Sequence, residues 1–235
     1  MKEKNKKLFL LLGINIILLL INIIFISDIP LSASCATQSA EVTPAESENQ
    51  IKKKIALTFD DGPHEKYTPM LLDGLKERNV SASFFLMGKN AEKYPKIVER
   101  MKEEGHVVGN HSYSHVQLNS MKEVEACKEM TKANEVIRKI TGETPNYVRP
   151  PFGAWSNNLD CITNMIVVLW DVDPLDWKCQ NKDLVVKRVV SKVKEDDIIL
   201  LHDSYQSTVE ATFEIIDTLE KEGYEFVTLD EMILE

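Results

Sequence analysis

From Ile55 onward, short apolar runs alternate with amphipathic segments, and this alternation constrains the fold more than any other feature of the sequence. Helical patterns separate most of the strand-like runs, and strands that alternate with helices form a mainly parallel sheet. The predicted strands cover 55–59, 81–86, 106–109, 146–149, 166–170, 198–201 and 225–228. The predicted helices cover 67–79, 92–104, 120–142, 182–194 and 207–222. The sequence therefore predicts an α/β protein whose seven strands form a closed or nearly closed barrel.

The longest helical pattern carries its own start and stop signals. Ser120 and Glu123 have the spacing of a capping box, and Gly142 fits a helix end. The apolar stripe expected to face the core consists of Met121, Val124, Cys127, Met130, Ala133, Ile137 and Ile140.

Five polar clusters follow the predicted strands. They are Asp60-Asp61, the stretch from His111 to His115, Arg149 with the residues after it, the stretch from Asp173 to Trp177, and His202-Asp203. Each has an ordinary explanation by itself, such as a strand-end turn or an exposed histidine. Because the carboxyl ends of parallel strands meet at one end of a barrel, we expect the five clusters to lie together.

His111 and His115 suggest a metal site. They are four residues apart, and on a helical turn this spacing places both imidazoles on one face. Exposed histidines explain most pairs of this kind. Joined to a carboxylate at a neighbouring strand end, however, the two histidines make a three-ligand set with an open position, which is the layout of a catalytic metal.

The clusters resemble the motifs of polysaccharide deacetylases of the NodB-homology type, carbohydrate esterase family 4. The matching stretches are Thr58-Phe59-Asp60-Asp61-Gly62-Pro63, His111-Ser112-Tyr113-Ser114-His115, Arg149-Pro150-Pro151-Phe152-Gly153, Asp173-Pro174-Leu175-Asp176-Trp177 and Leu200-Leu201-His202. They stand in the family's order, and the resemblance covers about residue 51 to the carboxyl terminus. It implies a distorted (β/α) barrel with seven or eight parallel strands.

The resemblance also implies a metal-dependent hydrolase that removes N-acetyl groups from a glycan and releases acetate. Asp61, His111 and His115 would hold one divalent metal. Zinc is the first choice, and cobalt or nickel are alternatives. Asp60 would be the general base that activates water, and Arg149 would orient it through a charge-assisted hydrogen bond.

The remaining roles concern the leaving group and the acetyl group. His202 would be the general acid that protonates the leaving amine, and Asp176 would raise its pKa. The backbone N–H at Phe152 would stabilise the oxyanion. Trp177 and Leu200 would line the pocket for the acetyl methyl group.

The amino-terminal residues indicate export. Four lysines precede an uncharged apolar run over 8–26, which is about as long as a bilayer-spanning helix. We expect residues 1–27 to be a single-pass anchor with its amino terminus inside, 28–50 an extracellular stalk and 51–235 the deacetylase domain outside the membrane. Secretion after signal cleavage, or lipidation of Cys35, are the alternatives.

Charge and location limit the partners. The formal net charge is −9, which argues against nucleic-acid binding because that binding depends on neutralising phosphates. The glycan nearest an external bacterial enzyme is peptidoglycan, so its N-acetylglucosamine is the expected substrate and a monomer the expected state. Chitin oligomers, exopolysaccharide and acetylated xylan are alternatives. N-acetylmuramic acid is less favoured, because a complete metal motif suits the N-acetylglucosamine branch better.

Two other classes of protein fit the sequence less well. A glycan-binding module with a degraded site would need a broken motif, and none is seen; an amidohydrolase for small amides would need a narrow closed pocket. The four cysteines, Cys35, Cys127, Cys161 and Cys179, form no C-x-x-C pair, which argues against a thiolate zinc site. Export would permit a disulfide, but the sequence leaves the pairing open.

Overall fold

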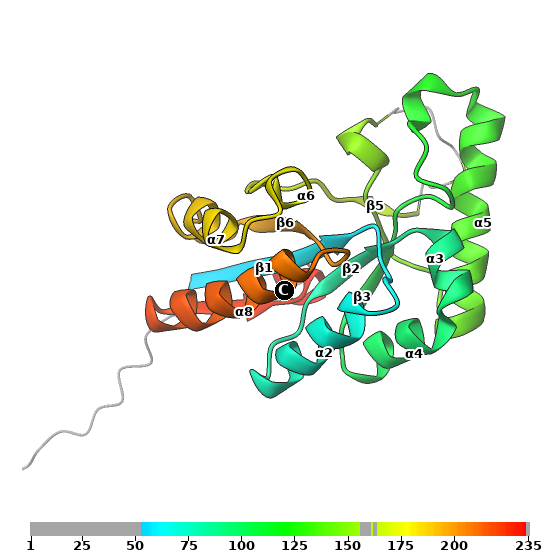
Figure 1. The fold of residues 1–235 in the computed structure, drawn as a ribbon. Helices are drawn as coiled ribbons and strands as arrows, with labels where there is room; N and C mark the ends of the chain where they lie inside the picture. The colour runs from blue at the N-terminus through cyan, green and yellow to red at the C-terminus, as the bar shows by residue number, and fades with distance from the viewer. Residues whose placement is uncertain (1–52, 156–160, 162–163, 234–235) are drawn as a thin grey trace, which may run out of the picture. The chain divides into compact units, whose positions relative to one another are not determined.

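Seven strands form one parallel sheet in the computed structural model, which describes residues 53–155, 161 and 164–233 (Figure 1). The strands are β1 (Lys53–Asp60), β2 (Ser83–Leu86), β3 (Val107–Asn110), β4 (Tyr147–Val148), β5 (Ile166–Val167), β6 (Ile198–His202) and β7 (Tyr224–Val227). Their order is β5-β4-β3-β2-β1-β6, and β7 pairs with the first half of β1. The prediction of a parallel α/β sheet is confirmed.

The predicted closed or nearly closed barrel is instead an open half-barrel. The end strands β5 and β6 do not pair with each other as strands, and the chain after β5 meets β6 through one parallel bridge, between Val172 and Ile199. The strand predicted over 166–170 ends at Val167. The N–H of Val168 still donates to the carbonyl oxygen of Val148, but the carbonyl oxygens of Val168 and Leu169 accept hydrogen bonds from the guanidinium of Arg149.

Alternation along β1 decides which side chains reach the interior of the half-barrel. Ile55, Leu57 and Phe59 pack in the large core cluster beneath the helices. Thr58 and Asp60 face the other way because successive side chains of a strand point to opposite sides of a sheet. The same alternation in β6 sends Ile199 and Leu201 outward and turns Leu200 and His202 toward Asp60.

A layer of helices covers the outer face of the sheet (Figure 1). In order of contact it consists of α7 (Lys182–Val190), α8 (Gln206–Lys221), α2 (Tyr67–Glu77), α4 (Pro95–Glu103) and α5 (Glu123–Thr141), with α3 (Gly88–Lys93) against α5. Two further short helices are α6 (Asp176–Cys179), after the fifth strand, and α9 (Leu229–Ile233), whose Leu229 packs inside the half-barrel with Phe85 and Tyr147. In the part of the chain that is described, no helix is long and apolar enough to cross a membrane; the anchor predicted over 1–27 and the stalk over 28–50 lie outside that part.

Three helix predictions needed correction at their ends, and the helix predicted over 182–194 ends at Val190. The single helix predicted over 92–104 is interrupted before Pro95, which begins α4 because it has no N–H to continue α3. The long helix begins at Glu123 rather than Ser120. Ser120 lies in a short 3-10 turn and its hydroxyl donates to the carbonyl of Gln117, so no capping box forms. Gly142 ends the helix with φ 82°, as predicted.

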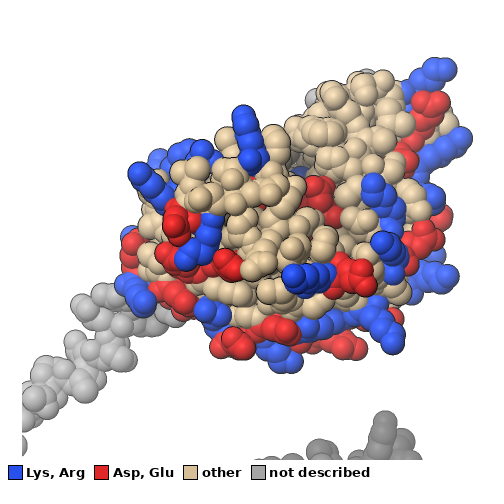
Figure 2. Space-filling model, in the orientation of Figure 1, with Lys and Arg blue, Asp and Glu red and all other residues tan. Residues whose placement is uncertain are grey.

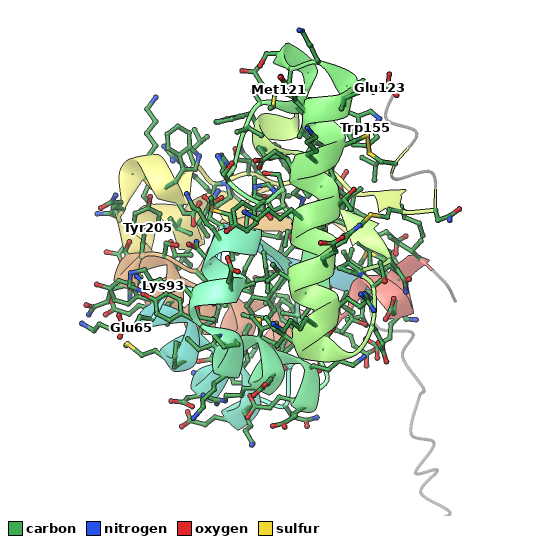
Figure 3. All side chains as sticks on the ribbon, turned by 90° about the vertical axis from the view of Figure 1, so that its right-hand side faces the viewer. Glu65, Lys93, Met121, Glu123, Trp155 and Tyr205 are labelled. Atoms are coloured by element: carbon green, nitrogen blue, oxygen red, sulfur yellow. A yellow bond between two sulfur atoms is a disulfide. The ribbon has the colours of Figure 1, made fainter. Side chains whose placement is uncertain are left out.

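The apolar stripe of α5 is correct except at its first turn. Val124 is 67% exposed, and Ala126 is buried in its place. Met121 and Trp155 lie around this end of the helix (Figure 3) and pack against the small core cluster that contains Ala126 and Met130. A disulfide between Cys127 and Cys161 ties α5 to the segment that precedes β5, whereas Cys179 is free.

Candidate active site

A buried ion pair lies at the carboxyl end of β1. Arg149 follows β4, is fully buried, and donates from Nη1 to Asp60 Oδ1 and to Thr58 Oγ1, at 2.8 Å each. Its guanidinium stacks over the ring of Phe85, 4.2 Å from the ring centroid. These contacts fix the arginine, and the arginine in turn holds Asp60 Oδ1 in place. Thr58 was missed, although its position two residues before Asp60 places it on the same face.

Asp61 and the two histidines converge beside Asp60. Asp61 Oδ1 lies 3.5 Å from His111 Nε2 and 3.3 Å from His115 Nε2. Asp60 Oδ2 lies 3.7 Å from His111 Nε2. Burial lowers the pKa of His115, against the nearby charge of Asp61, so its imidazole is neutral and able to act as a ligand at neutral pH.

The histidines reach this position from a loop, so the predicted helical turn is wrong. Ser112 and His115 both have φ 59°, outside the helical region. Side chains hold the loop: Asn110 Oδ1 accepts from the N–H of Ser112, Glu129 accepts from the N–H and hydroxyl of Ser114, and Ser112 Oγ accepts from the N–H of His115. It is therefore the conformation of this loop, and not a helical turn, that brings the rings of His111 and His115 together.

The three ligand atoms fit a divalent metal ion. Asp61 Oδ1 is buried and has no hydrogen-bond partner among the described residues, and the three atoms lie within 4.8 Å of one another. Two ligands about 2.1 Å from a tetrahedral zinc ion are about 3.4 Å apart, close to the distances found here. His111 Nδ1 lies 2.7 Å from the carbonyl oxygen of Arg149, which fixes the proton on Nδ1 and leaves Nε2 free for a metal.

His202 and Asp176 form a second pair, in which Asp176 is fully buried and His202 is partly buried. His202 Nδ1 lies 2.8 Å from Asp176 Oδ1, while Asp176 Oδ2 accepts from the N–H of His202 and the hydroxyl of Thr208. Burial lowers the pKa of His202, but the hydrogen bond to Asp176 and the charges of Asp176, Asp60 and Asp61 outweigh it and raise the pKa to about 9. The imidazole is therefore protonated at neutral pH.

Asp203 supports the turn that carries Asp61, a role that the sequence analysis missed. It is fully buried, and Thr68 donates to its Oδ2, while Thr68 Oγ1 accepts from the N–H of His64. Burial raises the pKa of Asp203 to about 7. A Cβ on Gly62 would lie 2.5 Å from Asp203 Oδ2, so only glycine fits against this carboxyl.

A largely apolar hollow opens beside these groups. It is lined by Asp60, Asp61, His111, His115, Phe152, Trp170, Asp173, Trp177, Leu200, His202 and Tyr205. The structure therefore brings together all the predicted site residues, either in this lining or, as with Arg149 and Asp176, directly behind it. Trp170 and Tyr205 were missed; the aromatic end of the predicted fifth strand was the one available signal.

Two exposed aromatic residues flank the hollow. Phe152 has φ 62°, which turns its ring outward over His115, with ring centroids 4.6 Å apart. Phe152 and Trp177 are 67% and 47% exposed. Exposed aromatic faces beside a polar centre suit the apolar faces of sugar rings. Charged side chains of both signs are interspersed around the face shown in Figure 2, so this face carries no single-sign field.

Comparison with known proteins identifies related sequences. A family model described as polysaccharide deacetylase matches residues 47–165. A peptidoglycan-N-acetylglucosamine deacetylase of Bacillus cereus is 42% identical over 188 residues, covering 77% of this chain and 68% of the relative. The peptidoglycan-N-acetylmuramic acid deacetylase PdaC of Bacillus subtilis is 42% identical over 181 residues, covering 77% of this chain. This chain spans only 39% of the length of PdaC.

Solved structures show the same architecture. The structure of PdaC from Bacillus subtilis matches with a TM-score of 0.75 at 42% identity, covering 77% of this chain and 90% of that chain. A family 4 acetyl xylan esterase from Clostridium thermocellum, in complex with a cobalt ion, matches with a TM-score of 0.73 at 36% identity, covering 77% and 91%. These matches agree with the parallel half-barrel described above.

Proposed function

The chain belongs to the polysaccharide deacetylase family, and on this premise we propose that it is a metal-dependent enzyme that removes N-acetyl groups from the N-acetylglucosamine of peptidoglycan and releases acetate. The observation that carries the proposal is the meeting, in one hollow, of a three-residue metal-ligand set, a fixed carboxylate and a protonated histidine. These are the groups that hydrolysis of an unactivated amide requires.

The metal ligands would be Asp61, His111 and His115. Zinc is the first choice because two imidazoles and one carboxylate with an open position are typical of catalytic zinc, and cobalt or nickel are alternatives. When bound, the ion polarises the acyl carbonyl and lowers the pKa of a water molecule.

Asp60 would accept the proton of the attacking water. Its Oδ1 is occupied by Arg149, which leaves Oδ2 directed toward the metal ligands, 3.7 Å from His111 Nε2. The fixed hydrogen bond prevents rotation of the carboxylate, so the basic oxygen stays aimed at the water. The N–H of Phe152 would donate to the oxygen that becomes negatively charged.

His202 would donate a proton to the nitrogen as the C–N bond breaks, which yields acetate and a free amino sugar. Asp176 holds the ring through Nδ1, so Nε2 is the nitrogen left for the substrate. Trp177 and Leu200 would enclose the acetyl methyl group in the apolar part of the hollow.

Peptidoglycan is favoured because both sequence relatives described above are named for it. The two are equally similar to this chain but are named for different sugars, so the choice of N-acetylglucosamine rests on the complete metal-ligand set. The disulfide between Cys127 and Cys161 supports an oxidising compartment. We also propose that the catalytic domain lies outside the cell membrane and acts as a monomer. It would be held there by residues 1–27 or be secreted.

The test is acetate release by the full chain from peptidoglycan and from chitin oligomers, with added zinc and again with a chelator. Chelator-sensitive release is expected, with peptidoglycan the better substrate. Asp60→Asn should keep the metal and lose about 10²- to 10⁴-fold in activity, whereas His111→Ala should lose both metal and activity. Release that ignores the chelator, or near-normal turnover by Asp60→Asn, would contradict the proposal.

A further inference from the structure

A second hollow adjoins the first and has a different character. It is lined by Asp61, Met87, Lys89, Asn90, Ser114, His115 and Ser204, so the two hollows meet at the metal ligands Asp61 and His115. The first is walled by aromatic and aliphatic side chains that suit the acetyl group. The second, which we call the polar hollow, is walled mainly by an ammonium, an amide and hydroxyl groups.

The polar hollow is fixed to the metal-ligand segments. The N–H groups of Gly88 and Lys89 donate to the carbonyl oxygens of Ser112 and Tyr113, at 2.9 and 3.0 Å, within the loop between the two histidines. Asn90 Nδ2 donates to the carbonyl oxygen of Asp61 at 2.7 Å. Lys89 therefore has a set position beside the reacting centre, and its side chain is not placed there by a mobile loop.

Lys89 carries a charge with no counter-ion. It is exposed, and among the described residues no carboxylate lies within ion-pair distance of its ammonium. Glu92, three residues on, is turned away to accept from the Tyr113 hydroxyl at 2.7 Å. Glu129 accepts from both the N–H and the hydroxyl of Ser114 at 2.8 Å. Among the lining residues, the carboxylate belongs to Asp61, whose Oδ1 faces the two histidines.

We propose that the polar hollow binds a carboxylate carried by the substrate glycan and that Lys89 is a specificity-determining residue, pairing with that carboxylate. The inference rests on the proposed deacetylase function and adds the chemical class of the substituent. In peptidoglycan a carboxylate is supplied by the stem peptide, or by the lactyl group of muramic acid where the peptide has been removed. Chitin oligomers and xylan carry none, so Lys89 would favour acidic cell-wall glycans over neutral ones.

The test compares three substrates: soluble peptidoglycan fragments, the same glycans stripped of peptide by an amidase, and chitin oligomers. Lys89→Met removes the charge and keeps an unbranched side chain of similar length. For the acidic glycans it should raise KM about two- to fivefold with kcat unchanged, as expected for one exposed ion pair. For chitin oligomers it should change neither constant. Lys192→Met is the matched control, because Lys192 follows α7 and lines neither hollow.

The pattern of loss also identifies the source of the carboxylate. If Lys89→Met raises KM more for the stripped glycans, the carboxylate is that of the lactyl group. If it raises KM more for the intact fragments, the carboxylate belongs to the stem peptide. The difference between wild type and Lys89→Met should shrink as salt is raised. Chelator-sensitive acetate release that responds to Lys89→Met equally on all three substrates, or on none, would overturn the inference alone. No acetate from any substrate with the wild type would overturn the proposed function and this inference with it.

Discussion

Replacing Asp176 with asparagine should move the pH at which activity is lost. In the wild type, burial lowers the pKa of His202, but the hydrogen bond and charge of Asp176, together with the charges of Asp60 and Asp61, raise it to about 9. The Asp176→Asn substitution would remove this hydrogen bond and charge, and burial would then draw the pKa of His202 back toward the ordinary value of about 6.5, against the remaining charges of Asp60 and Asp61. A general acid acts in its protonated form, so activity falls as pH rises through this pKa.

The size of the effect follows from the two protonated fractions. At pH 8 about 90% of His202 is protonated with a pKa of about 9, and about 3% with a pKa of about 6.5. At pH 6 the same two fractions are about 100% and about 75%, so the variant loses about 20-fold more kcat/KM at pH 8 than at pH 6. A bound cation would lower the pKa of His202 in the wild type and in the variant alike. The quantity to compare is therefore the difference between their two pH profiles.

The assay is kcat/KM for acetate release between pH 5.5 and about 9.5, with zinc held constant. Asp173→Asn is the matched control. It removes a carboxylate from the same hollow, but among the residues that the structure describes Asp173 Oδ1 accepts a hydrogen bond only from the N–H of Leu175. The alkaline limb of the pH profile should therefore stay where it is in the wild type. An equal loss for Asp176→Asn at every pH would show that Asp176 does not tune the acid, and the assignment of His202 would be wrong.

Two further predictions concern the support of the site. Gly62→Ala should weaken metal affinity about 10- to 100-fold, because the new Cβ would lie 2.5 to 2.9 Å from atoms of the Asp203 carboxyl. Adding Asp203→Ala should restore much of this affinity. If the double variant binds metal no better than Gly62→Ala in a competition titration with a metal indicator, the proposed support of the Asp61 turn by Asp203 is wrong. Cys127→Ser should lower the free energy of unfolding in urea by about 4 kcal/mol, because the cross-link to Cys161 is lost. Cys161→Ser should give the same value. Unfolding curves that coincide with that of the oxidised wild type would show that the disulfide contributes nothing to stability.

Local patterns predicted much of this fold. Apolar periodicity located all seven strands and most helices, and Gly142 marked the end of the longest helix. The errors lie where a contact from elsewhere in the chain overrides the local pattern. The fifth strand ends at Val167, and the carbonyl groups of the next two residues bind Arg149. Val124 is exposed although it fits the stripe of α5.

The sequence by itself determined which chemical groups stand at the carboxyl ends of the strands, because a parallel sheet brings those ends together. The tertiary structure decided which atoms meet. Strand register sets Asp60 beside His202, although the two are far apart in the chain, and the loop conformation directs His111 and His115 toward Asp61. Contacts of Asp203 and Lys89 with the site carry no local signature. Their positions depend on packing between distant segments, and only the folded chain supplies that packing.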